Sequence, residues 1–202
     1  NQNISLPLNN NFVDSEFKIG FPAEEILSKS QELNKCMVIM GSTGVDNEIK
    51  NIFGSVSTKV ARNSKAPVLI IPQYSKFTIP DKMAYCSNNI ETDAHAIQEL
   101  TSFAKTFDSE LHIIHVNDNK DDYQEREILK MFRRFYPETR LKIQSLKSSD
   151  KLSAVNKYVE ENEIKMLALC REKRGVLSSM FHRSFTKHIT INSKIPLLVL
   201  NK

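Results

Sequence analysis

Ser64-Lys65-Ala66-Pro67-Val68-Leu69-Ile70-Ile71 recurs as Ser193-Lys194-Ile195-Pro196-Leu197-Leu198-Val199-Leu200, 129 residues further along the chain. At the same offset the apolar run 37–40 matches 166–169, and the register holds without a gap from Ile26 and Val155 onward. A period of this length is too long for a solenoid and indicates two copies of one domain. We therefore predict a first domain within residues 1–75 and a second within residues 80–202.

Short apolar strands alternate with amphipathic helices from residue 82 to the end of the chain. The predicted strands are 82–87, 111–116, 140–146, 165–170 and 196–200. The predicted helices are 93–107, capped by Thr92 or Asp93, then 121–136, one capped by Asp150, and 179–190. This alternation predicts an α/β fold of the Rossmann-like type, with a doubly wound, five-stranded parallel sheet.

The first copy begins partway through the same pattern. Mapping the second copy back by 129 residues predicts strands near 11–19, 37–40 and 68–71, with helices at 22–33 and 55–63. Counterparts of residues 82–136 would lie before Asn1, so about 50 residues of the repeat are missing from the first copy. The first strand of such a sheet is central. We therefore expect the first copy to be incomplete and unstable alone.

Composition narrows the class of protein. The chain has 202 residues, 40% of them hydrophobic, and a net charge of +4, which is typical of a soluble globular protein. A nucleic-acid binder would concentrate Lys and Arg with interleaved aromatic residues, and no apolar run is long enough to cross a bilayer. The residues present hold no secretory signal, and the three cysteines form no C-x-x-C pair. We expect a cytoplasmic protein that binds neither nucleic acid nor membrane.

A glycine pattern follows the apolar run 37–40. Gly41-Ser42-Thr43-Gly44 is followed by nine residues and then by Gly54-Ser55, at the start of a predicted helix. Bare backbone N–H groups in such a loop, and at a helix N-terminus, can surround phosphates. The pattern predicts a nucleotide site made of Gly41, Ser42, Gly44, Gly54 and Ser55, with Ser57 as a further phosphate ligand. The alternative is a tight turn that needs glycine and binds nothing.

The glycine spacing, with Ser57 and the segment Ala66-Pro67-Val68-Leu69-Ile70-Ile71-Pro72, resembles the ATP-binding branch of the universal stress protein family. Gly20-Phe21-Pro22-Ala23-Glu24-Glu25-Ile26 resembles the lead into that family's third helix. The resemblance implies a tandem protein that binds ATP or a related adenine nucleotide in a stress response. It also implies a homodimer or pseudo-dimer that pairs through Val68–Ile71 and Leu197–Leu200.

The second copy departs from the family pattern. Cys170, Lys173 and Arg183 stand at the positions of Gly41, Gly44 and Gly54, so side chains fill the space that phosphates need. Asn88 stands about where the family has an aspartate on its first strand. We expect this copy not to bind ATP in the family manner. Its basic segment is either a solvated loop, which we favour, or a separate anion site.

Three functions remain open at this stage. The leading hypothesis is a non-enzymatic, nucleotide-responsive binding module with no catalytic residues. A slow ATPase or phosphotransferase would need Asp46 and Glu48, the carboxylates of the glycine loop. A nucleotide-free scaffold would need neither. We predict no metal site, because His112 and His115 are three apart on a strand and face opposite sides.

Overall fold

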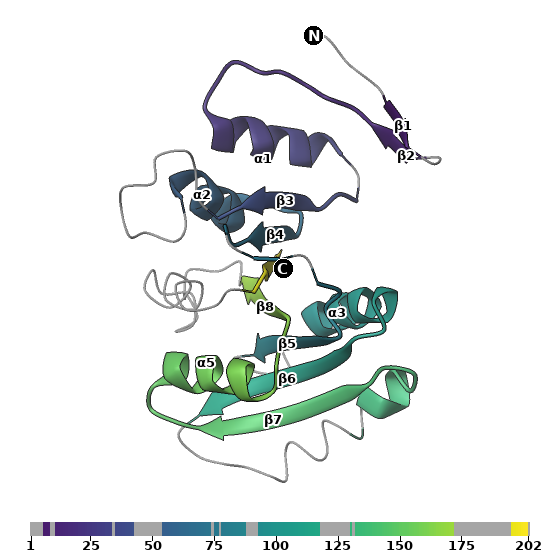
Figure 1. The fold of residues 1–202 in the computed structure, drawn as a ribbon, viewed down its shortest axis with the longest axis vertical. Helices are drawn as coiled ribbons and strands as arrows, with labels where there is room; N and C mark the ends of the chain where they lie inside the picture. The colour runs from purple at the N-terminus through teal and green to yellow at the C-terminus, as the bar shows by residue number, and fades with distance from the viewer. Residues whose placement is uncertain are drawn as a thin grey trace.

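The computed structural model describes residues 6–8, 11–33, 35–42, 54–73, 75–76, 78–87, 93–117, 130, 132–171 and 195–201. They form one seven-stranded sheet, flanked by helices, and a separate two-stranded hairpin (Figure 1). In spatial order the large sheet contains β3 (Val38–Gly41), β4 (Val68–Ile71), β9 (Leu197–Asn201), β8 (Met166–Arg171), β5 (Lys82–Ser87), β6 (Glu110–Asn117) and β7 (Leu141–Lys147).

Five strands of this sheet come from the second copy. Within the order β9-β8-β5-β6-β7 every neighbouring pair is parallel, and β5, the first of the five in the chain, is central. This arrangement confirms the predicted doubly wound α/β fold. The inner strands β5 and β8 are buried on both faces, as is expected of a parallel sheet covered on both sides, whereas the edge strand β7 is not.

The last strands of the two copies lie side by side within the chain. β4 and β9 pair antiparallel, with Val68 opposite Val199 and Ile70 opposite Leu197. β3 adds to the outer side of β4 in a parallel pair. The sheet is therefore seven strands wide and mixed. It joins the five predicted parallel strands of the second copy to two strands of the first, through the segments Val68–Ile71 and Leu197–Leu200 for which the resemblance implied pairing.

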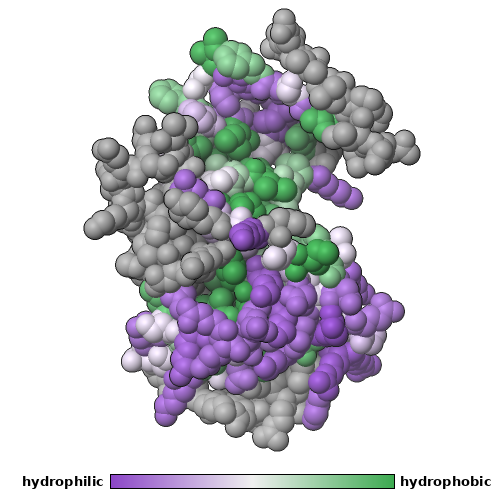
Figure 2. All heavy atoms as spheres, viewed as in Figure 1, coloured by the Kyte–Doolittle hydropathy of each residue, from purple (hydrophilic) through white to green (hydrophobic). Residues whose placement is uncertain are grey.

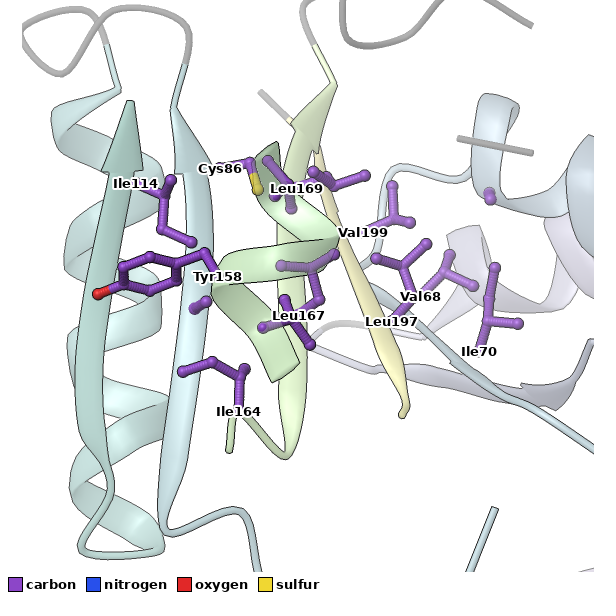
Figure 3. Packing of buried hydrophobic residues seen from close by; sticks show 14 of the residues in the cluster. Val68, Ile70, Cys86, Ile114, Tyr158, Ile164, Leu167, Leu169, Leu197 and Val199 are labelled. Atoms are coloured by element: carbon purple, nitrogen blue, oxygen red, sulfur yellow. The ribbon is translucent and has the colours of Figure 1, made fainter. Parts of the chain in front are cut away.

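The helices lie on both faces of the sheet. α1 (Pro22–Glu32), α2 (Ser55–Asn63) and α5 (Lys151–Glu161) contribute to a core that includes β4, β8 and β9. Figure 3 shows Val68 and Ile70 of the first copy beside Leu197 and Val199 of the second in this core. α3 (Ala94–Thr106) belongs to the core on the opposite face, with Met83, Ile113 and Leu198. One continuous apolar layer therefore joins the two copies.

Local sequence signals explain most of the boundaries. Asp150 accepts a hydrogen bond from the Ser153 N–H at 3.1 Å, which confirms it as the N-cap of α5. α2 spans the predicted residues, and Pro22 begins α1 in the first turn, where the missing N–H of proline costs nothing. Asp93 does precede α3, but its side chain makes no capping hydrogen bond to the helix.

The predicted strand at 11–19 is wrong in extent and in position. Only β2 (Asn11–Val13) is a strand, and it pairs antiparallel with β1 (Leu6–Leu8), outside the main sheet. In the doubly wound order the third and fourth strands are not neighbours, so β2 has no place next to β3. The predicted helix at 179–190 and most of the one at 121–136 lie outside the described residues.

Among the residues described, no helix combines the length and the apolar character that a bilayer crossing requires.

Candidate functional site at the carboxyl end of β3

The backbone of Ser42, at the end of β3, is hydrogen-bonded to two other parts of the chain. Its N–H donates to the carbonyl of Ile71 at 2.9 Å, at the end of β4. Its own carbonyl accepts the N–H of Gly54 at 2.6 Å, directly before α2. The structure thus brings Gly41 and Ser42 together with Gly54, Ser55 and Ser57, as the glycine pattern predicted. Thr43 and Gly44 lie outside the described residues.

The N-terminus of α2 has the features of an anion site. Gly54 is its N-cap and makes no side-chain capping bond, while the first intrahelical bond runs from the Thr58 N–H to the Gly54 carbonyl at 3.0 Å. The N–H groups of Ser55, Val56 and Ser57 therefore have no intrahelical acceptor. The first turn of α2 contains no acidic residue, whereas that of α1 contains Glu24 and Glu25. Helix-dipole electrostatics then favour an anion at α2.

The backbone conformation at residue 54 does not require a glycine. Its φ of −60° and ψ of 157° are extended values that any residue adopts. What glycine does provide at this position is an N-cap without a side chain to occupy the first-turn donors, as Ser or Asp would. This weakens, at Gly54, the interpretation of the loop as a turn that merely requires glycine.

Ser57 has a different role in this structure from the one predicted. Its side chain is buried, and its hydroxyl lies 3.1 Å from the carbonyl of Ser42 and 3.1 Å from that of Gly54. The hydroxyl proton is therefore directed at the backbone and holds the loop against the helix. Ser55, two residues earlier, is exposed. Of the two serines, Ser55 has the hydroxyl that solvent reaches, and phosphate contact by Ser57 stays a prediction.

The other end of α2 is held by the second copy. The guanidinium of Arg171, at the end of β8, donates to the carbonyls of Arg62 and Ser64, the latter at 3.3 Å. Cationic donors at a helix C-terminus complement the dipole and satisfy carbonyls that lack intrahelical partners. The orientation of α2, and with it of the candidate site, therefore depends on both copies.

Residues 9–72, which include β3, β4 and the glycine pattern, match the model of the universal stress protein family. Over this segment the chain is similar to that family. The segment begins before β2 and ends just after β4, so the candidate site lies within its matched residues. The universal stress protein match thus falls on the first copy and includes its glycine pattern.

Curated relatives match over short segments. Universal stress protein YxiE of Bacillus subtilis is 40% identical over 52 residues, which are 26% of this chain and 35% of that protein. Stress response protein NhaX of the same organism is 38% identical over 66 residues, 32% of this chain and 40% of that protein. The matched segments thus span less than half the length of these curated relatives.

Solved structures extend the likeness in fold to nearly the whole chain. A universal stress protein from Archaeoglobus fulgidus superposes with a TM-score of 0.66 at 24% identity, over 90% of this chain and 65% of that one. A putative universal stress protein from Pseudomonas aeruginosa gives 0.64 at 17% identity, over 91% and 69%. At these identities the likeness concerns the fold alone.

The second copy has a different residue at the position equivalent to Gly41. Cys170, the counterpart of Gly41, is buried, and its residue type adds a side chain where the first copy has none. Lys173, Arg183 and Asn88 lie outside the described residues. That this copy does not bind ATP in the universal stress protein manner stays a prediction.

A buried polar cluster at the carboxyl end of β5 was missed by the sequence analysis. The Ser87 hydroxyl donates to the Asp93 carboxylate at 2.7 Å, and both side chains are almost fully buried. Burial, together with the negative charge of Asp93, raises the pKa of the nearby Tyr85 hydroxyl. The sequence signal was Asp93 itself, which was assigned only as a helix cap. The cluster fixes the start of α3 against β5.

His112 is part of a structural cluster and not of the candidate site. Its Nδ1 is hydrogen-bonded to the Tyr158 hydroxyl at 2.9 Å, and its Nε2 lies 3.1 Å from Glu110 but is not aligned for a hydrogen bond. Burial lowers the pKa of His112, although Glu110 opposes the shift, and burial raises the pKa of Tyr158 to about 12. Glu110 begins β6, so the cluster lies at the amino edge of the sheet, whereas ligands of such folds bind at the carboxyl edge.

Proposed function

We propose that this universal stress protein segment binds ATP or a related adenine nucleotide at the loop between β3 and α2, in a stress response. One observation supports the proposal above the others. The donors of the first turn of α2 lie beside the carboxyl end of β3, because the Ser42 carbonyl accepts the Gly54 N–H at 2.6 Å. Backbone donors at a helix N-terminus favour phosphate groups.

The donor set fits a phosphate better than a carboxylate side chain or a metal. It consists of the N–H groups of Ser55, Val56 and Ser57 and the exposed hydroxyl of Ser55, all of which donate to anionic oxygens. Across the described residues no group of three or more His, Cys, Asp or Glu side chains is placed to hold a metal ion. A phosphate is compact enough to accept several of these donors at once.

In this proposal the protein is a switch and not an enzyme. The binding energy shifts the packing of α2, which contacts α1 through the Lys59–Glu24 ion pair and the second copy through Arg171. A slow ATPase would require Asp46 and Glu48, which lie outside the described residues. A cytoplasmic location and dimer formation are further parts of the proposal.

Ser55→Pro provides a direct test. Proline at the first helical position keeps the helix, and the extended ψ of 157° at Gly54 suits a residue that precedes proline. The substitution removes the Ser55 N–H, while the matched control Ser55→Ala removes only the hydroxyl. We expect calorimetric titration with Mg-ATP to show about tenfold weaker binding for Ser55→Pro than for Ser55→Ala.

A second test substitutes a glycine of the first copy by the residue at the equivalent position of the second copy. Gly44→Lys places in the first copy the residue found at the equivalent position of the second, Lys173. If the loop binds phosphates, binding should be lost while the unfolding midpoint stays within a few degrees. Titrations in which the unmodified chain takes up no ATP, ADP or AMP would refute the proposal and favour the nucleotide-free scaffold.

A further inference from the structure

Arg171 belongs to the second copy, but its side chain contacts the helix that carries the candidate site. At the offset of 129 residues it is the counterpart of Ser42, whose carbonyl closes the loop between β3 and α2. The guanidinium of Arg171 donates to the carbonyl of Arg62 and, at 3.3 Å, to that of Ser64. Ser42 has a hydroxyl and no cationic group, so the first copy has no guanidinium with which to make the reciprocal contact. This contact therefore runs in one direction, from the second copy to the first.

The C-terminus of α2 is the end that this contact stabilises. Ser64 is its C-cap, and the Ser64 N–H donates to the carbonyl of Val60 at 2.8 Å. The carbonyls that follow Val60 lack intrahelical donors, as at the end of any helix. Two of them, those of Arg62 and Ser64, receive the guanidinium instead. Because Ser64 is fully buried, the guanidinium takes the place that water has at an exposed helix end.

Few other contacts fix the ends of α2. The helix has 9 residues, and a helix of that length is marginal without contacts that stabilise it. Its first turn has neither a capping side chain nor an acidic residue, whereas α5 has Asp150 as its N-cap. Figure 2 shows apolar surface, in green, over the half of the molecule that holds α1, β3 and β4, while the other half is mainly hydrophilic. Ile19 and Ile39, for example, are 91% and 65% exposed. The first copy is less well covered, so a contact at the end of α2 matters more there.

The two ends of α2 are linked through the helix itself. Nine residues span only about 13 Å, so a cation at the C-terminus and an anion at the N-terminus interact with the same dipole. The N-terminus is joined to β3, because the Gly54 N–H donates to the Ser42 carbonyl at 2.6 Å. A restraint on the C-terminus therefore lowers the ordering cost of binding a ligand at the N-terminus. By reciprocity, a bound ligand strengthens the contact with Arg171.

We propose that Arg171 is a positioning residue of the candidate site. By fixing the C-terminus of α2 it holds Gly54 and the first-turn donors beside β3. The second copy thereby sets the affinity of the first copy for a phosphate-bearing ligand. This regulation rests on the proposed nucleotide binding, whereas the positioning of Gly54 does not, so the two can be tested separately.

Arg171→Leu tests the positioning without any ligand. Arg140→Leu is the matched control, because the Arg140 guanidinium also donates to a backbone carbonyl, that of Asp108, but within the second copy. Hydrogen exchange at the Gly54 amide, measured by NMR, reports the closure of the loop. The Ala154 amide, which makes the first intrahelical bond of α5, is the internal reference. We expect exchange at Gly54 to be about tenfold faster in Arg171→Leu and unchanged in Arg140→Leu.

Titration with Mg-ATP tests the regulation. We expect Arg171→Leu to bind about fivefold more weakly than the unmodified chain, and Arg140→Leu to bind equally well. Arg171→Lys keeps the charge but not the pair of donors in a fixed geometry, so its affinity should lie between those of Arg171→Leu and the unmodified chain.

Each readout can contradict the proposal. Unchanged exchange at Gly54 in Arg171→Leu would overturn the positioning, and so would equal acceleration at Gly54 and Ala154, which indicates general destabilisation. Unchanged affinity despite faster exchange at Gly54 would overturn the regulation. A chain that takes up no nucleotide would refute the proposed function, and exchange at Gly54 would still decide whether Arg171 positions the loop.

Discussion

The carbonyl of Ser42 accepts the N–H of Gly54 at 2.6 Å, and this bond closes the loop between β3 and α2 at the carboxyl edge of the sheet. It brings the strand end to the helix N-terminus although the intervening residues 43–53 separate them in sequence. The buried hydroxyl of Ser57 reaches the same carbonyl. The candidate site therefore has a backbone scaffold of its own, which can be tested apart from any ligand.

Ser57→Ala should destabilise the chain by about 1 kcal/mol, because it removes a buried hydroxyl that is hydrogen-bonded to the backbone. Ser55→Ala, in the same turn but exposed, should change the free energy of unfolding by less than about 0.5 kcal/mol. Urea unfolding at pH 7 measures both. Equal effects of the two substitutions would show that the Ser57 bond does not stabilise the loop.

Val68→Ala and Val199→Ala should each cost about 2–3 kcal/mol, because both side chains are fully buried. The two residues face each other across the antiparallel junction of β4 and β9. In a double-mutant cycle we expect a coupling energy of at least about 0.5 kcal/mol. Strict additivity would contradict direct packing between the copies. Val155→Ala, paired with Val68→Ala, serves as a comparison within the same core.

Acidification should destabilise the chain through His112. Burial holds the folded-state pKa of His112 below its ordinary value of 6.5, so the unfolded state binds the proton more readily. This contribution to stability is complete above pH 6.5 and is lost as the pH falls below it. Glu110 opposes the shift, whereas Lys142 and Lys82 reinforce it.

The measurement is the unfolding free energy from pH 7.5 to 5. His112→Phe should flatten the dependence on pH relative to the unmodified chain. Tyr158→Phe removes the hydrogen-bond partner but keeps the imidazole, so it should lower stability at every pH and keep the slope. If the unfolding free energy of His112→Phe depended on pH as steeply as that of the unmodified chain, His112 would not be the cause of the pH dependence.

Ser87→Ala should cost about 2 kcal/mol, because it leaves the buried Asp93 carboxylate without the hydroxyl that donates to it at 2.7 Å. Ser102→Ala, at an exposed serine of α3, should stay within about 0.5 kcal/mol of the unmodified chain. Thermal unfolding of both variants checks the difference. A cost at Ser87 no larger than that at Ser102 would mean that the carboxylate is satisfied without Ser87.

The local pattern predicted the bounds of several described elements closely, and the structure explains why. β5 and α2 have the predicted bounds, since an apolar run with clear flanking residues limits the possible register. The prediction at residues 11–19 was wrong for a different reason. It was transferred from a strand of the second copy, and local sequence does not define which strands lie beside it in the sheet. A strand needs a partner for its backbone groups. β2 pairs with β1 instead.

In the candidate site, too, some residues could be predicted from the sequence and others could not. The glycine spacing located Gly41, Ser42, Gly54 and Ser55, because a strand, a loop and a helix start are contiguous features of the chain. The role of Ser57 and the Ser87–Asp93 pair could not be predicted, because both depend on which polar atoms burial brings within 3.1 Å of one another.

The sequence by itself determined the α/β class and the position of the glycine pattern between β3 and α2, because each of these depends on residue type at a short or fixed spacing. Only the tertiary structure decided that β4 and β9 pair within one chain, where the resemblance had left a homodimer or a pseudo-dimer open. Strand order depends on long-range packing, in which apolar faces such as Val68 and Val199 must be buried together. No local pattern of residues specifies that choice of partner.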